Sequence, residues 1–286
     1  MKRIVLGAFT IVLASARLSA GADEAKPSAN KSDYNVFNPT PVNLMRELSP
    51  DRPDKTESPY TVDAGHFQLE MDYANYTQDD SDGVNTRAWN VAPFNLKLGL
   101  FNNVDWQSVY DNYLHVHTVD QSGHATTQSG FGDFTTRLKI NLWGNDGGRT
   151  ALALLPFVKF PTSTDHLGNN SVEGGVILPL AVKLPGGWDM GLETAASDMR
   201  NEESPGHHAE FIQSITFDHA LVGRLSGYGE FFSDISTTGG PGWVATVDFG
   251  LEYALGENVQ LDCGCNVGVS RAADDLNPFA GITVRF

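Results

Sequence analysis

The stretch GFGDFTTRLKINLWGNDGGRTALALLPFVKFP, residues 130–161, decides the fold. From Phe134 to Leu142 mostly apolar side chains occupy every second position, and polar or charged ones stand between them. A period of two belongs to a β-strand, because successive strand side chains point to opposite faces. The glycine-rich run 144–148 tolerates the positive φ of a tight turn, and a second strand follows over 149–160. The stretch therefore predicts a β-hairpin.

The polar face of this hairpin indicates its environment. It carries Arg137, Lys139 and Lys159, and the same arrangement recurs to the C-terminus. In a soluble sandwich the apolar face would pack on a second sheet, whereas in a membrane barrel it faces lipid and the charged face lines a wet lumen. We interpret the unit as one hairpin of a membrane β-barrel.

The connections between the predicted strands alternate in length. Short ones are expected at 101–103, 144–148, 185–187, 219–221 and 256–258, and long polar ones at 115–129, 162–170, 201–208, 233–242 and 271–277. Outer-membrane barrels alternate in this way, because short turns face the periplasm and long loops face outward. The expected fold class is all-β, a transmembrane antiparallel up-and-down barrel of about twelve strands, with ten or fourteen as alternatives. Strand two should bulge at Pro93, where the alternation changes phase.

The chain divides into three parts. Residues 1–22 have a basic start, an apolar run and small residues at the end, and are predicted to be a cleaved signal peptide. Residues 23–64 are rich in proline and are expected to form a periplasmic extension or a plug. Residues 65–286 should form the barrel, since no later run reaches the roughly 18 apolar residues of a membrane helix.

The net charge and the cysteine content argue against a nucleic-acid partner and against cysteine chemistry. Loss of the first 22 residues leaves 16 of the 19 basic side chains against 35 acidic ones, a net charge of −19. This charge argues against a nucleic-acid partner. Cys263 and Cys265 lie two apart on a predicted strand, so they share a face, are poorly placed for a disulfide and should be inert.

Two stretches resemble a known family. Residues 51–70, DRPDKTESPYTVDAGHFQLE, and residues 130–133, GFGD, with their continuation to Thr162 are similar to the transporter-like outer-membrane family named for a MetA pathway of phenol degradation. The resemblance covers most of the chain after Asp51. It implies passage of small solutes, hydrophobic or aromatic ones among them, and it carries over no catalytic residues.

The final residues also resemble an assembly signal. Ile282, Val284 and Phe286 are similar to the C-terminal strand signature by which outer-membrane barrels are recognised for assembly. The expected partners are therefore the barrel assembly machinery, outer-membrane lipids and small-molecule solutes. The expected location is the outer membrane of a Gram-negative-type bacterium, with both termini in the periplasm.

The alternation assigns charged side chains to the lumen. The pore-lining candidates are Glu70, Asp72, Lys97, Asp105, Asp111, Arg137, Lys139, Lys159, Glu193, Arg224, Asp248, Glu252, Asp262 and Arg285. Such charges tune the selectivity of an open pore, or they pair with one another and fill a narrow barrel. The sequence leaves both interpretations open.

Metal binding and catalysis have little support in the sequence. The histidines at 207 and 208 and at 115–117 lack a fixed carboxylate partner, so no metal and no cofactor are predicted. No hydrolase, metalloprotease or phosphate-binding motif is present. A serine such as Ser204 or Ser233 with His207 at the outer rim is the only arrangement that would suggest an enzyme. The spacing of these residues in the sequence does not require them to meet.

Three hypotheses follow. The favoured one is a channel or porin-like transporter for small solutes. The alternatives are a structural or surface-interaction barrel with a filled lumen, and a lipid-modifying enzyme, of which the second is weaker because no catalytic motif accompanies it. We expect that the protein is not an enzyme.

Overall fold

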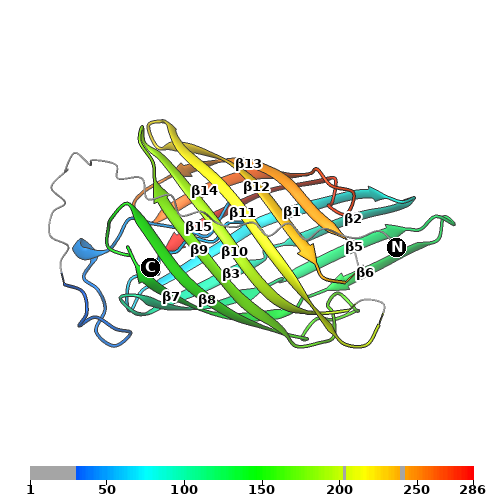
Figure 1. Cartoon of the computed structure of the whole chain (residues 1–286), viewed down its shortest axis with the longest axis horizontal. Coiled ribbons are helices and arrows are strands. Elements are labelled where there is room, and N and C mark those ends of the chain that lie inside the picture. The colour runs from blue at the N-terminus through cyan, green and yellow to red at the C-terminus, as the bar shows by residue number, and fades with distance from the viewer. Residues whose placement is uncertain (1–29, 202–203, 239–241) are drawn as a thin grey trace, which may run out of the picture.

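The described part of the chain folds into one antiparallel β-sheet (Figure 1) with fifteen strands. The computed structural model describes residues 30–201, 204–238 and 242–286, and the predicted signal peptide lies outside these ranges. The strands are β1 (Phe67–Ser81), β2 (Val84–Val91), β3 (Phe94–Phe101), β4 (Val104–Tyr110), β5 (Tyr113–Val119), β6 (Ala125–Gly130), β7 (Phe134–Trp143), β8 (Thr150–Phe160), β9 (Glu173–Lys183), β10 (Trp188–Arg200), β11 (His207–Val222), β12 (Leu225–Ser236), β13 (Trp243–Ala254), β14 (Val259–Gly268) and β15 (Leu276–Arg285).

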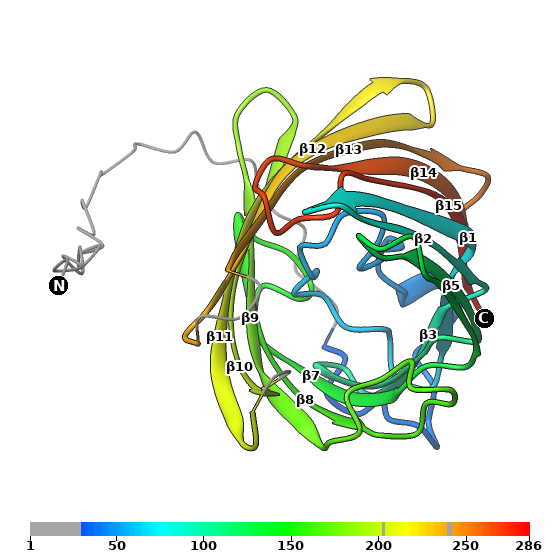
Figure 2. The same cartoon turned by 90° about the vertical axis from the view of Figure 1, so that its right-hand side faces the viewer.

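Twelve of these strands close into a barrel. The first strand pairs with the last, from Gln68 opposite Arg285 to Gln78 opposite Leu276, and this pairing closes the ring. On its other side, β1 pairs with β3 over residues 67–71 and with β2 over residues 74–81. Figure 2, viewed along the barrel, shows the resulting ring. The predicted all-β class and twelve-strand count are confirmed.

The other three strands, β2, β5 and β6, extend the barrel wall at the long-loop end. The second predicted strand is divided into β2 and β3. The division lies at Ala92, which has a φ of 54°, and at Pro93, which has no backbone N–H to donate. This is the position of the predicted bulge. The prediction of a polar loop over 115–129 is wrong, because β5 and β6 form a paired hairpin there. Strand β6 is polar on both faces and shows no apolar alternation, and the alternation in β5 is short, so neither strand gave a clear signal.

The helical content is small. A single 3-10 turn, η1 (Val42–Leu44), occurs in the described ranges. No helix among the described residues has the length and apolar composition needed to cross a membrane.

The wall has the polarity expected of a membrane barrel. Its outward positions carry exposed apolar side chains such as Phe217, Phe231 and Phe249. Its inward positions carry buried ionisable groups, and Asp105, Lys139 and Asp248 are fully buried. This pattern is the reverse of a soluble protein and suits a lipid exterior around a polar interior.

Candidate functional site

A loop of the chain that precedes β1 lies inside the barrel. We call residues 47–62 the inner loop, which contacts strands all around the lumen (Figure 2). It enters and leaves at the short-turn end, where Arg46 pairs with Asp146 in the β7–β8 turn and Asp63 pairs with Arg285. Its two ends meet, because the backbone N–H of Arg46 donates to Asp63 Oδ2 at 2.9 Å. Next to this contact, the N–H of Thr40 donates to the carbonyl of Ala64 at 2.9 Å. The inner loop is thus closed at its base.

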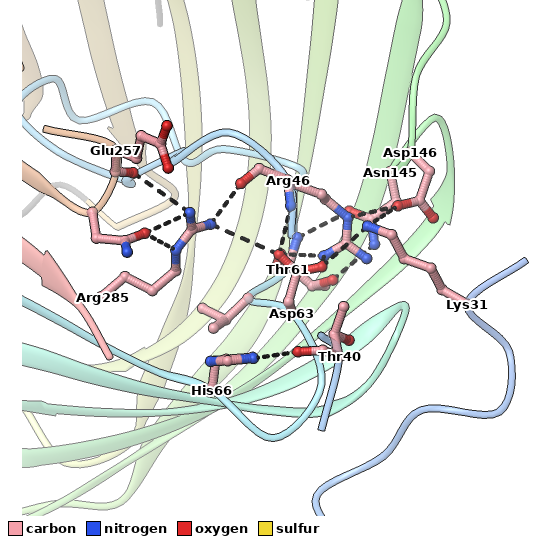
Figure 3. A network of polar contacts seen from close by, with 12 residues as sticks. Lys31, Thr40, Arg46, Thr61, Asp63, His66, Asn145, Asp146, Glu257 and Arg285 are labelled. Carbon is pink, nitrogen blue, oxygen red and sulfur yellow. Dashed lines mark hydrogen bonds and ion pairs between the residues drawn. The ribbon is translucent and has the colours of Figure 1, made fainter. Parts of the chain in front are cut away.

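The base is held by a charged cluster that we call the neck, comprising Lys31, Arg46, Asp63, Asp146 and Arg285 (Figure 3). The Asp63 carboxylate is buried and lies within 3.2 Å of Lys31 Nζ, 3.3 Å of Arg46 Nη1 and 3.7 Å of Arg285 Nη1. Asp146, in the turn between β7 and β8, accepts from Arg46 Nε at 3.0 Å and pairs with Lys31 at 2.9 Å. Burial opposes ionisation of Asp146, but hydrogen bonds from Asn102 and Lys31 and the charge of Arg46 hold its pKa below the usual value.

The inner loop places Asp51 between two buried lysines of the wall. Lys97 Nζ on β3 and Lys139 Nζ on β7 both donate to the Asp51 carboxylate. The backbone N–H of Asp51 donates to Glu70 on β1, and Glu70 also pairs with Lys97. Two ammonium groups and two carboxylates therefore neutralise one another where water is largely excluded.

The next residue, Arg52, connects the inner loop to the seam of the barrel. Its guanidinium contacts both oxygens of Asp262 on β14, through Nε at 2.9 Å and Nη2 at 2.6 Å, and also pairs with Asp72 on β1. The same group lies 6.0 Å from the ring centroid of Phe279 on β15. A bidentate pair of this kind fixes orientation as well as charge.

Backbone amides of the inner loop bind carboxylates on the opposite wall. The N–H groups of Lys55 and Thr56 donate to the two oxygens of Glu230 at 2.9 and 2.8 Å. The N–H of Glu57 donates to Glu193 at 2.7 Å. These contacts give buried carboxylates the partners that they require.

Small wall residues give the inner loop room. A Cβ on Gly99 of β3 would lie 2.7 Å from the carbonyl oxygen of Val62, the last residue of the inner loop, and a Cβ on Gly281 of β15 would lie 2.2 Å from Arg52 Nη2. Both distances are far below van der Waals contact. Glycine at these two positions therefore permits the close approach of the inner loop.

A cavity of about 750 Å³ lies beside the inner loop at the short-turn end. Apolar groups of Leu48, Tyr60 and Met190 line it together with the carboxylates of Asp54 and Asp218. Neither of these two carboxylates is in an ion pair with a described residue. The lining also includes basic side chains such as Arg52 and Lys183, so the cavity offers a small solute apolar, acidic and basic contacts.

Thirteen of the fourteen predicted pore-lining residues fall into three groups. Those that contact the inner loop or its neck are Glu70, Asp72, Lys97, Asp105, Arg137, Lys139, Glu193, Asp248, Asp262 and Arg285. Glu252 lines the cavity. Asp111, which accepts from Asn90, and Lys159, which pairs with Glu173, lie apart from these contacts.

The assignment of Arg224 to the lumen needs correction. Strand β11 continues to Val222, and the turn is formed by Gly223, with a φ of 61°, and Arg224. The Arg224 side chain is exposed and donates to the carbonyl of Leu255. The predicted turn at 219–221 lies too early by a few residues, and this shift placed Arg224 on the strand.

Several residues that bind the inner loop or form its neck were not predicted from the sequence. Glu230 lies on β12 at a position that strand alternation alone would assign to the lumen. By contrast, Arg46 and Asp63 lie outside any strand, so no periodicity could have identified them. Among the described residues, no three His, Cys, Asp or Glu side chains are arranged to hold a metal ion.

Solved structures share this fold. An outer membrane channel from Pseudomonas putida F1 matches with a TM-score of 0.55 at 12% identity, over 84% of this chain and 100% of the channel. The NanC porin matches with a TM-score of 0.51 at 8% identity, over 76% of this chain and 98% of the porin. At such identities the likeness shows the fold, which is that of outer-membrane barrels. No curated protein matches the sequence. Residues 50–286 match the family described as "Putative MetA-pathway of phenol degradation", and the chain therefore belongs to that family.

Proposed function

We propose that this protein is an outer-membrane channel for small solutes and that the inner loop is its plug. The observation that carries the proposal is how the lumen is filled. One continuous loop, closed at its neck, occupies the space between charged walls and is held by ion pairs and hydrogen bonds. Groups of this kind can exchange their partners for water, so the loop can leave its site without exposing an apolar core.

The proposed orientation follows the lengths of the connections. Short turns, both barrel termini and the neck lie at one end, which we assign to the periplasm, and the longer loops face outward. In this arrangement the plug enters from the periplasm, and the cavity of about 750 Å³ opens beside it on the periplasmic side.

The proposed solutes are small and include hydrophobic or aromatic molecules. Leu48, Tyr60 and Met190 provide the cavity with apolar surface, beside polar groups that can orient a solute. The family description, with its reference to phenol degradation, agrees with this class of solute.

A disulfide between plug and wall tests whether the plug must move. The hydroxyl oxygens of Thr56 on the inner loop and Ser214 on β11 lie 2.6 Å apart, so cysteines there are placed to bond. We expect the double variant Thr56→Cys, Ser214→Cys to lose at least about tenfold of its current in planar bilayers when oxidised and to recover it on reduction. The native Cys263 and Cys265 are changed to serine in all samples.

Each single-cysteine variant is the matched control and should conduct equally under both conditions. If the verified cross-link leaves the current unchanged, solute passage does not need movement of this part of the loop. If the uncross-linked barrel is folded but silent under all conditions, the structural or surface-interaction barrel with a filled lumen is the better hypothesis.

The C-terminal strand provides a test of assembly. Ile282 and Val284 lie on the outward side of β15, and Phe286, the residue after this strand, is 68% exposed. We expect Phe286→Asp to lower the amount of folded protein in the outer-membrane fraction, because a charge replaces the terminal aromatic group at the lipid surface. Phe286→Trp, which keeps an aromatic ring, should assemble normally. Normal membrane levels of Phe286→Asp would contradict the assigned assembly signal.

A further inference from the structure

Three side chains with hydrolase chemistry meet on the outer surface of the barrel. Ser171 precedes β9, Asp198 is on β10 and His207 begins β11. Ser171 Oγ lies 2.9 Å from His207 Nε2, and Asp198 Oδ2 lies 3.4 Å from His207 Nδ1. The two ring nitrogens of one histidine thus face a hydroxyl and a carboxylate, which is the order of groups in a serine hydrolase.

The strand register places this cluster outside the lumen. Asp198 pairs with Ala209, and His207 pairs with Arg200, so Asp198 and His207 are diagonal neighbours on one face of the β10–β11 pair. The buried residues Ala195 and Ser197 alternate with Asp198 along β10, which makes the Asp198 face the outward one. The side chains of His207 and Asp198 are 36% and 70% exposed.

The surroundings of the cluster suit a lipid substrate. Val172 follows Ser171 directly, and Val176 and Phe211 continue an exposed apolar surface down β9 and β11. Arg200 is directly opposite His207 and forms no ion pair with a described residue. Apolar groups below and a cation beside the histidine match the acyl chains and the phosphate of a membrane lipid.

We propose that Ser171, His207 and Asp198 form an esterase site that cleaves acyl esters of membrane lipids at the long-loop rim. This activity is independent of the channel. It differs from the serines that the sequence suggested, because Ser233 accepts a hydrogen bond from Trp243 and Ser204 lies in the exposed loop before β11. His207 is instead hydrogen-bonded to Ser171.

The reaction needs no further cofactor. His207 Nε2 takes the proton of Ser171 Oγ as the oxygen attacks the ester carbon, and the leaving alcohol receives that proton as the ester C–O bond breaks. Water then attacks the acyl-serine, His207 takes its proton, and the bond to Oγ breaks. A fatty acid leaves, and Ser171 regains its proton from His207. Asp198 is a positioning residue that orients the imidazole.

The test uses the refolded mature chain in two assays. One measures labelling by a fluorophosphonate, and the other measures fatty acid released from phosphatidylethanolamine vesicles. We expect Ser171→Ala and His207→Gln to lose label and turnover by about 100-fold or more. Asp198→Ala should lose less and Asp198→Glu should recover part of the loss, whereas a merely structural role would give no such rescue.

Matched controls separate this proposal from the channel and from misfolding. Ser204→Ala, in the neighbouring loop, should keep full label and turnover. All variants should retain the heat-sensitive mobility of a folded barrel and the wild-type conductance. No label on the folded wild-type chain overturns the proposal. Hydrolysis of a soluble short-chain nitrophenyl ester without release of fatty acid from vesicles overturns the assignment of a lipid substrate.

Discussion

Asp51→Ala should convert a mostly closed channel into a mostly open one. The Asp51 carboxylate accepts from Lys97 and Lys139, whose side chains are 2% and 0% exposed. Removing one partner of a buried ion pair costs on the order of 3–5 kcal/mol when the remaining charge is left poorly compensated. In Asp51→Ala, Lys97 keeps Glu70 as a partner, whereas Lys139 keeps only Glu57 at 3.9 Å. This cost falls on the docked state alone, since water can reach both lysines once the inner loop has left. The ratio of docked to undocked loop should therefore fall by about two to three and a half orders of magnitude, at about 1.4 kcal/mol per tenfold.

The measurement is the open probability of single channels in planar bilayers. Glu47→Ala is the matched control, because Glu47 is an exposed carboxylate of the same loop and forms no ion pair with a described residue. It should gate as the wild type does. An Asp51→Ala barrel that is folded yet as closed as the wild type would show that these lysine contacts do not hold the plug.

Removal of the inner loop should give a wide channel that selects cations. Arg46 and Asp63 are in contact, so a glycine–serine link can replace residues 47–62 without stretching the wall. The carboxylates left without their loop partners are Glu70, Asp72, Asp105, Glu193, Glu230, Asp248 and Asp262, whereas the bases are Lys97, Arg137 and Lys139. A pore lined by an excess of acids attracts cations.

The reversal potential in a salt gradient measures this selectivity. Adding Glu193→Gln and Glu230→Gln to the deletion removes two of these charges and should move the reversal potential toward that of a non-selective pore. An anion-selective pore, or a folded barrel that stays silent after the deletion, would contradict the assignment of the inner loop as the plug.

The barrel could be predicted because its signals are local. Apolar alternation and glycine turns lie within single hairpins, and the predicted strand 188–200 agrees with β10 residue for residue. The hairpin of β5 and β6 was missed for an equally local reason. In β6, Thr126 to Ser129 are all polar, so both faces are polar and the period of two disappears, and in β5 Leu114 and Val116 alternate with His115 and His117 over only four residues.

Only the wall residues of the candidate site could be predicted from the sequence, and the inner-loop residues that they bind could not. Strand alternation assigned Lys97, Lys139 and Asp262 to the interior, because it reports which face a side chain occupies. It cannot report which partner a side chain meets across the lumen. The pairing of Asp262 with Arg52 joins residues 210 positions apart, and neither residue carries a local sign of the other. The contact of Ser171 with His207 was missed for the same reason.

The span of these contacts sets an order of assembly. The inner loop precedes every strand, yet Arg52 needs Asp262 on β14, and the carbonyl of Arg46 needs Arg285, 239 residues later, on β15. Contacts of such separation form late, because long segments must be ordered first. The earliest described part of the chain is thus the last to find its place. A barrel in which β1 has not yet paired with β15 cannot bind the inner loop. Such an intermediate would therefore let solutes cross the membrane.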